Sequence, residues 1–167
     1  MQRAIFAKAI QFLTPANAII SDYYGTPSGS KSRFNMAMSY HITEAINYVA
    51  DKAVVDYTKV VYTKGNLLNA QNLICQAAAG ALLELTWTNN SGQGEAKSTD
   101  KLMIIVVEEA TQNYEFFLKV DTRDSGIYNV NLPAYLTGAA VHVYAFMASE
   151  DGKINSTSQH LGMFTVV

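Results

Sequence analysis

The residues that could do chemistry are few and lie far apart in the sequence. The three histidines, His41, His142 and His160, lack the short spacing of a zinc motif, and no HExxH or paired Cys/His pattern occurs. Cys75, the single cysteine, falls in an expected strand without a helix N-terminus or a cationic neighbour to lower its pKa. We therefore expect no metal site, no disulfide and no cysteine nucleophile, and we interpret His41 as a partly buried histidine of a helix.

An oxygen-rich loop is the best candidate for binding a cation. It runs over Asn89–Gly94 and is followed by Glu95 and Asp100. Calcium prefers oxygen ligands, but its loops usually carry several carboxylates, and here only two occur, at the far end. A turn in which Asn and Gly supply positive φ angles is the preferred interpretation. A calcium- or carboxylate-dependent enzyme centred on residues 89–100 stays an alternative.

No other pattern indicates catalysis. Glu108 and Glu109 are neighbours in an expected strand, so their carboxylates point to opposite faces and cannot act together as acid and base. The sequence contains no GxSxG, P-loop or GxGxxG motif. We expect no catalytic residues, no cofactor and no enzymatic activity.

Aromatic residues offer a different kind of site, because the chain has ten tyrosines. Aromatic rings on a sheet face stack on sugar rings or anchor protein interfaces. They also occur as ordinary strand residues with one polar tip in water. The expected interaction surface consists of Tyr114, Phe116, Tyr128, Tyr135 and Tyr144.

The elements that position these residues are organised around the only tryptophan, Trp87. The segment Ala81–Thr88 alternates, with Leu83, Leu85 and Trp87 on one face. After the Asn/Gly-rich turn, an apolar run returns over Lys101–Glu109. We interpret these segments as the facing central strands of a β-sandwich, with Trp87 in its core.

The whole chain is expected to fold as α+β, with short N-terminal helices packed on a C-terminal antiparallel β-sandwich of seven to eight strands. The expected domains are a helical region, 1–55, and the sandwich, 56–167. Helices are expected over 2–13, 15–24 and 34–49. Strands are expected near 59–63, 72–78, 81–88, 101–109, 114–120, 126–132, 140–148 and 160–166. The strand 140–148 is apolar on both faces, and the N-terminal helices are its expected cover.

Composition excludes several classes of function. Hydrophobic residues make up 49% of the chain and charged residues 16%, the net charge is −2, and the basic residues are scattered, so we expect no nucleic-acid partner. No stretch approaches the roughly 18 consecutive apolar residues of a membrane-spanning helix. The N-terminus lacks the features of a signal peptide. The location is therefore undetermined, and a cell surface or an assembled particle is the expectation if the chain is a trimmed form.

Two resemblances follow from particular stretches. Residues 57–167 resemble a fibronectin type III or immunoglobulin-like sandwich, on the strength of the strand that ends in Trp87-Thr and the late strand beginning at Val141. Almost the whole chain is also similar to an uncharacterised Bacteroidota family, a domain of unknown function. The stretches that carry this resemblance are Gln2-Arg-Ala-Ile-Phe-Ala, Phe34-Asn-Met-Ala-Met-Ser-Tyr-His, Asp56-Tyr-Thr-Lys-Val-Val and Leu85-Thr-Trp-Thr-Asn-Asn-Ser-Gly-Gln-Gly-Glu-Ala-Lys. Members of that family start earlier, with a glycine-rich basic segment, so we expect a trimmed or processed form here, in which Met1 is an added start.

These observations favour a non-enzymatic structural or protein-interaction module. We expect a protein partner or self-association, as in a component of a surface, phage-like or filamentous assembly. A carbohydrate-binding module that uses exposed aromatic residues on a sheet face is the alternative.

Overall fold

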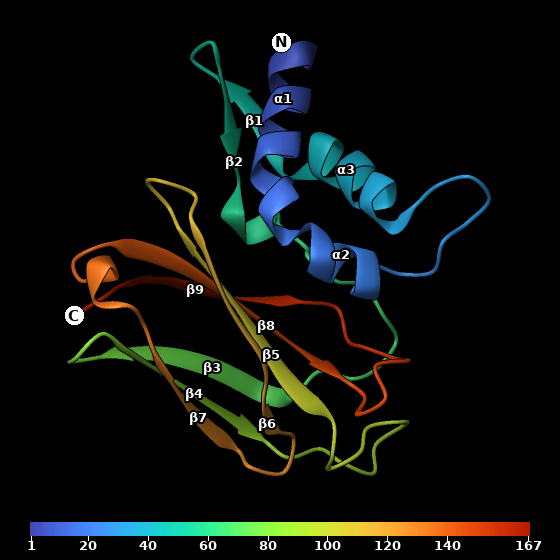
Figure 1. Cartoon of the computed structure of the whole chain (residues 1–167), viewed down its shortest axis with the longest axis vertical. Coiled ribbons are helices and arrows are strands. Elements are labelled where there is room, and N and C mark those ends of the chain that lie inside the picture. The colour runs from blue at the N-terminus through green and yellow to red at the C-terminus, as the bar shows by residue number, and fades with distance from the viewer. The chain divides into compact units, whose positions relative to one another are not determined.

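The computed structural model describes all residues from 1 to 167, and the chain divides into two compact units, Met1–Gly65 and Asn66–Val167 (Figure 1). The segment 56–65, expected to begin the sandwich domain, belongs to the first unit. That the two units are separately folding domains stays a prediction, and each is described by itself.

The first unit opens with a nearly continuous helical segment. It comprises α1 (Gln2–Leu13), the 3-10 turn η1 (Thr14–Ala16) and α2 (Asn17–Tyr23). Helical spacing places Ala9, Phe12 and Leu13 on one buried face of α1. After a loop, α3 (Arg33–Glu44) begins where the Ser32 hydroxyl accepts a hydrogen bond from the Asn35 amide at 3.2 Å. The helices expected over 2–13 and 15–24 are therefore present.

A short hairpin follows α3, and it corrects the expected third helix. That helix ends at Glu44 instead of continuing to Val49. Strand β1 (Ile46–Val49) pairs antiparallel with β2 (Lys52–Val55) across a two-residue turn. Apolar spacing typical of a helix continues through this segment, but Tyr48 and Val49 are residue types that are enriched in strands. Pairing of this segment with β2 favours the strand over the helix.

The expected strand over 59–63 is absent. The 3-10 turn η2 (Tyr57–Lys59) occupies its start, and residues beyond it join no sheet ladder. The Asp56 side chain caps this turn by accepting a hydrogen bond from the Thr58 amide at 3.1 Å. Such a cap favours a tight turn over an extended strand.

The opening helical segment also bears on the expectation of no membrane span. Together, α1, η1 and α2 cover Gln2–Tyr23, 22 residues that are long and apolar enough to cross a bilayer by length and composition. A single helix of this kind near the N-terminus is weak evidence, because core helices of soluble proteins and signal sequences pass the same test. In this structure Phe12, Leu13 and Ile20 are fully buried in the protein.

The second unit is an antiparallel β-sandwich. Its elements are β3 (Gln71–Ala78), β4 (Leu82–Thr88), β5 (Lys101–Glu108), β6 (Tyr114–Thr122), β7 (Ile127–Asn131), the 3-10 turn η3 (Ala134–Leu136), β8 (Ala140–Ala148) and β9 (Gln159–Thr165). One sheet has the order β3-β4-β7 and the other β6-β5-β8-β9. The prediction of an α+β chain with a sandwich of seven to eight strands is confirmed. The strands β4 and β5 lie in different sheets, as expected.

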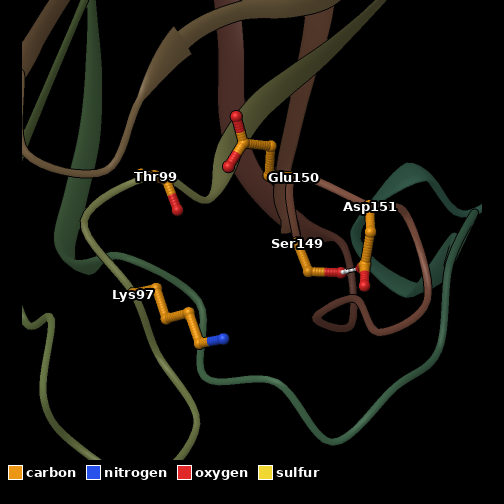
Figure 2. A pocket seen from close by; sticks show the side chains of 5 residues that line it. All are labelled: Lys97, Thr99, Ser149, Glu150 and Asp151. Atoms are coloured by element: carbon orange, nitrogen blue, oxygen red, sulfur yellow. Dashed lines mark hydrogen bonds between the residues drawn. The ribbon is translucent and has the colours of Figure 1, made fainter.

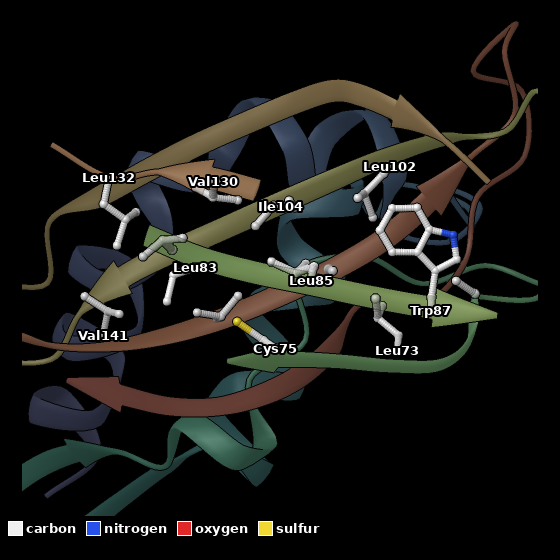
Figure 3. Close-up of a cluster of buried hydrophobic side chains, with 14 of the residues drawn as sticks. Leu73, Cys75, Leu83, Leu85, Trp87, Leu102, Ile104, Val130, Leu132 and Val141 are labelled. Carbon is white, nitrogen blue, oxygen red and sulfur yellow. The ribbon is translucent and has the colours of Figure 1, made fainter. Parts of the chain in front are cut away.

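The core of the sandwich lies between these sheets (Figure 3). From β4, Leu83, Leu85 and Trp87 meet Leu102 and Ile104 from β5. The Trp87 side chain is only 7% exposed, which confirms its predicted place. Each fully buried leucine contributes roughly 1.5–3 kcal/mol relative to exposure, so this alternating face accounts for much of the stability of the sandwich.

Strand β8 is buried on both of its faces. Val141 and Val143 belong to the sandwich core, while Tyr144 and Phe146, which alternate with them, are also fully buried. The expectation for residues 140–148 is therefore confirmed on this point. That the N-terminal helices form the second cover stays a prediction.

Candidate functional site

Two of the expected aromatic residues stack on strand β6. The rings of Tyr114 and Phe116 are 5.5 Å apart and nearly parallel, with an interplanar angle of 8°. Both are half-buried. Their cross-strand neighbours on β5 are Val107 and Ile105, so the stack lies on the sheet face that points away from the sandwich core.

Tyr135 is the most exposed member of the expected aromatic surface. It lies in η3, its side chain is 59% exposed, and its hydroxyl donates a hydrogen bond to Glu115 at 2.6 Å. This hydrogen bond raises the pKa of Tyr135 to about 12. Glu115 alternates with Tyr114 and Phe116 along β6, so Tyr135 approaches the opposite face of the sheet from their stack.

The remaining two aromatic residues correct the expectation of a single exposed surface. Tyr144 is fully buried in β8, because this strand is apolar on both faces. Tyr128, on β7 in the other sheet, is half-buried against the sandwich core. The five residues therefore lie on different faces and at different depths, and that they form an interaction surface stays a prediction.

A buried arginine lies at the end of the sandwich and was not singled out from the sequence. Arg123 is 0% exposed, and its guanidinium lies 2.9 Å from the Asp100 carboxylate. It also donates to the Asn90 side chain at 2.7 Å and to the Leu68 carbonyl at 2.7 Å. Its own carbonyl accepts the Trp87 indole N–H at 2.8 Å. One side chain thus connects segments around residues 68, 90 and 100, and its backbone holds the core tryptophan.

This network reduces the support for the calcium alternative at residues 89–100. Asp100 Oδ2 accepts hydrogen bonds from Arg123 and from the Lys97 amide, while Asp100 Oδ1 is buried without a hydrogen-bond partner. A guanidinium so close would repel a second cation, while Glu95 is an exposed residue of the loop. No group of three or more His, Cys, Asp or Glu side chains that could hold a metal ion occurs among residues 1–167.

Next to this network lies a polar groove (Figure 2). Five side chains line it: Lys97 and Thr99 from the β4–β5 loop, and Ser149, Glu150 and Asp151 from the β8–β9 turn. Its volume is about 350 Å³. The segment that supplies Lys97 and Thr99 ends at Asp100, the residue that Arg123 holds.

Hydrogen bonds also order the other wall of the groove. The Ser149 hydroxyl donates to Asp151 at 2.7 Å and accepts from the Ile154 amide at 3.1 Å. The Lys153 amide donates to the same Asp151 oxygen at 3.0 Å. The Ser149 hydrogen bond, followed by that of Lys153, lowers the pKa of Asp151, so the carboxylate is anionic at neutral pH. No histidine lines the groove, and the Ser149 hydroxyl is held by the Asp151 carboxylate.

The structure brings together two histidines that are distant in the sequence. His142 Nδ1 lies 3.0 Å from His160 Nε2, and His142 Nε2 lies 3.4 Å from Glu109. Burial lowers the pKa of His142, against the opposing effect of Glu109. The third histidine, His41, lies in α3 and has hydrogen-bond partners on both ring nitrogens, but it is fully buried where a partly buried position was expected.

The remaining candidate groups are held in structural roles. Cys75 is buried, and burial raises the pKa of its thiol to about 12, so it is an inert packed thiol. The adjacent carboxylates separate as expected: Glu108 accepts from the Thr111 hydroxyl, whereas Glu109 faces His142.

Sequence comparison assigns the chain to a protein family. The family model for DUF6266, a family of unknown function, matches residues 1–162. The chain belongs to DUF6266. The search of curated proteins found no match.

Solved structures with a similar arrangement are fibronectin type III domains. The fn3 domain of the human collagen alpha-1(XX) chain is 11% identical, with a TM-score of 0.40, and the match covers 62% of this chain and 84% of that one. The FN5 domain of Drosophila Lar is 14% identical, with a TM-score of 0.39, and 58% and 92% are covered. The FN1–FN3 domains of chicken CNTN1 are 8% identical, with a TM-score of 0.39, and 63% and 34% are covered. We base the fold on the strand order of the DUF6266 chain itself.

The groove and the arginine network of this DUF6266 chain could not be found by motif. The partners of Arg123 lie 23 to 55 residues away along the sequence. The one indication in the sequence was the oxygen-rich loop, in which Asp100 was considered as a calcium ligand and not as the partner of an arginine. Ser149, Glu150 and Asp151 match no sequence motif that would indicate a site.

Proposed function

We propose that this DUF6266 chain is a non-enzymatic interaction module that binds a polar segment of a protein partner in the groove at the loop end of its sandwich. The observation that carries the proposal is the groove of Lys97, Thr99, Ser149, Glu150 and Asp151. It offers an ammonium, two carboxylates and two hydroxyls on one concave surface. A peptide segment with both charges and hydrogen-bonding groups complements such a surface.

The groove is supported by ordered loops. On one side, Asp100 is fixed by Arg123 and by the Lys97 amide. On the other, Ser149 and Asp151 hold each other. Loops ordered before binding lose less conformational entropy when a partner binds, so a preformed groove favours recognition. Loops on a rigid scaffold are also where binding residues concentrate.

The titratable groups support binding over catalysis. Asp100 forms a buried ion pair with Arg123, Cys75 is buried, and no histidine lies beside Ser149 in the groove. The carbohydrate alternative has less support than it had from the sequence, because Trp87 and Tyr144 are buried and Tyr114 and Phe116 are half-buried. We propose an assembly role at a surface, in a phage-like particle or in a filament, in a bacterium of the Bacteroidota.

Affinity capture from the native host tests this proposal. The wild-type chain is compared with a groove variant, Lys97→Glu with Glu150→Lys, which keeps the net charge. The control is Lys31→Glu with Glu44→Lys, which reverses two exposed charges in the first unit. We expect a partner that the wild type and the control capture and the groove variant loses by about tenfold or more. Equal capture by all three chains, or by none, would refute the role of the groove.

A further inference from the structure

The edge strands of the sandwich are irregular, whereas the hairpin of the first unit is regular. Register shifts interrupt β3, β6 and β9, and these strands contain Asn72 with φ 54°, Lys119 with φ 53° and Gly162 with φ 130°. Bulges of this kind bend an edge and prevent another strand from pairing with it. Lateral strand addition to β3, β6 and β9 is therefore disfavoured.

The β1–β2 hairpin has no such protection. It is a two-stranded sheet with an uninterrupted register, and neither strand pairs with any other strand. Its turn residues, Ala50 and Asp51, both have positive φ, as in a type I′ turn, so Val49 and Lys52 form the first hydrogen-bonded pair. The Asp56 amide donates to the Ala45 carbonyl at 2.8 Å, so Ala45 and Asp56 continue the alternation of hydrogen-bonded and non-bonded pairs along the hairpin.

This alternation determines which backbone groups point outward. Hydrogen-bonded pairs alternate with non-bonded pairs, so on β2 the amides and carbonyls of Ala53 and Val55 point away from β1. No backbone hydrogen bond satisfies them on that edge. Between them, the side chain of Val54 is 47% exposed on the open face of the hairpin. The edge therefore combines unused hydrogen-bonding groups with an exposed apolar residue.

We propose that β2 pairs antiparallel with β2 of a second copy of this chain, about a two-fold axis at Val54. In this register, Ala53 forms a hydrogen-bonded pair with Val55 of the second copy, and the two Val54 side chains meet on the open face. Lys52 then lies opposite Asp56 of the second copy, once on each side of the axis. This inference rests on the proposed interaction function and deepens it by naming a partner for self-association.

Charge complementarity argues for a second copy. Lys52 lies two residues before Val54, and Asp56 lies two residues after it, so their charges are opposite. Only a two-fold axis at Val54 places Lys52 of each copy opposite Asp56 of the other. Asp56 already accepts hydrogen bonds from Thr58 and lies 3.8 Å from Lys59, yet its side chain stays 26% exposed and open to a second cation. The β1 edge, Ile46–Val49, has no charged residue that would fix a register.

Sedimentation equilibrium over a concentration series tests the pairing with the full chain. We expect the wild-type mass to rise towards that of a dimer. Val54→Lys and Val54→Glu each place like charges opposite each other at the axis, so each variant alone should raise the dissociation constant by about tenfold or more. An equal mixture of the two should associate again, because the axis then pairs a lysine with a glutamate. Val49→Lys is the matched control, since it adds the same charge at an exposed position of the same hairpin away from the axis.

Amide exchange supplies the second measurement. Protection of Ala53 and Val55 should increase with protein concentration, while that of Ile46 and Tyr48, on the other edge, should not. A wild-type chain that stays monomeric, or a Val49→Lys variant that dissociates as fully as Val54→Lys, would overturn the inference. If the wild-type chain associates and the Val54 variants associate equally well, pairing through β2 is wrong. Self-association under the proposed function would then still stand. Conversely, loss of the groove-dependent partner leaves this pairing unaffected.

Discussion

At the scale of single residues, Arg123 determines how the loop end of the sandwich is built. It is fully buried and donates to one carboxylate oxygen of Asp100, to the side chain of Asn90 and to the carbonyl of Leu68. Arg123→Met would leave the Asp100 carboxylate, only 1% exposed, without its cation. Removing one partner of a buried ion pair lowers the free energy of unfolding by about 3–5 kcal/mol. Urea unfolding followed by Trp87 fluorescence measures this loss.

A double variant separates the ion pair from general damage. Combining Arg123→Met with Asp100→Asn removes both charges, so the double variant should be more stable than the sum of the two single losses implies, by about 0.5–3 kcal/mol. Strictly additive losses would show that the two side chains do not act as a pair.

His41 gives the first unit a pH dependence. Its Nδ1 donates to the Ala37 carbonyl at 2.7 Å, and its Nε2 accepts from the Val61 amide at 3.1 Å, so the second of these bonds requires the neutral ring. Burial lowers the pKa of His41 from 6.5 to about 4. The unfolded chain therefore binds a proton that the folded chain excludes between these values. Stability is intact above pH 6.5 and should fall by up to about 1.4 kcal/mol per unit as the pH drops towards 4.

Denaturant unfolding followed by circular dichroism at 222 nm reports on the helices of this unit and measures the slope. His41→Gln is the control, because glutamine can accept from Val61 but does not titrate. A slope that survives in His41→Gln would assign the pH dependence to other groups.

At the scale of elements, alternation and turn chemistry were sufficient to predict all seven strands of the sandwich. Leu83, Leu85 and Trp87 mark the buried face of β4, and the Asn/Gly-rich loop separates it from β5. The hairpin was missed because its turn, Ala50-Asp51, has no glycine and because Ile46 and Val49 continue the apolar spacing of α3. A short pattern that fits both periods is decided by strand pairing, which a single segment does not reveal.

The site was less predictable than the fold for a related reason. Burial of Tyr144 depends on what covers its strand, and the pairing of Asp100 with Arg123 depends on contacts between distant segments. The sequence singled out the oxygen-rich loop as a turn or a cation site, whereas Asp100 in the structure pairs with Arg123, 23 residues away. Spacing along the chain carries no information on such contacts.

The hairpin turn makes a prediction at this scale. Ala50 and Asp51 have φ angles of 47° and 62°, a conformation that costs a non-glycine residue roughly 1–2 kcal/mol. Replacing Ala50-Asp51 by Asn-Gly supplies the residues that a type I′ turn prefers. We expect stabilisation by about 1 kcal/mol, measured as a rise in melting temperature of about 2–4 °C. An unchanged or lower melting temperature would show that the turn is not strained as its φ angles indicate.

At the scale of the whole molecule, the proposed pairing limits how far the chain assembles. A two-fold contact uses the same β2 edge in both copies, so it closes at a dimer. A filament would need a second, heterologous contact, which the groove at Lys97 and Glu150 would supply only where the segment it binds belongs to another copy of the chain. Sedimentation velocity should therefore show growth that levels off at a dimer for the purified chain and for the variant Lys97→Glu with Glu150→Lys. Growth beyond a dimer that this variant stops would support a filament built through the groove. Growth beyond a dimer that the variant leaves unchanged would contradict both the closed pairing and the groove as the second contact.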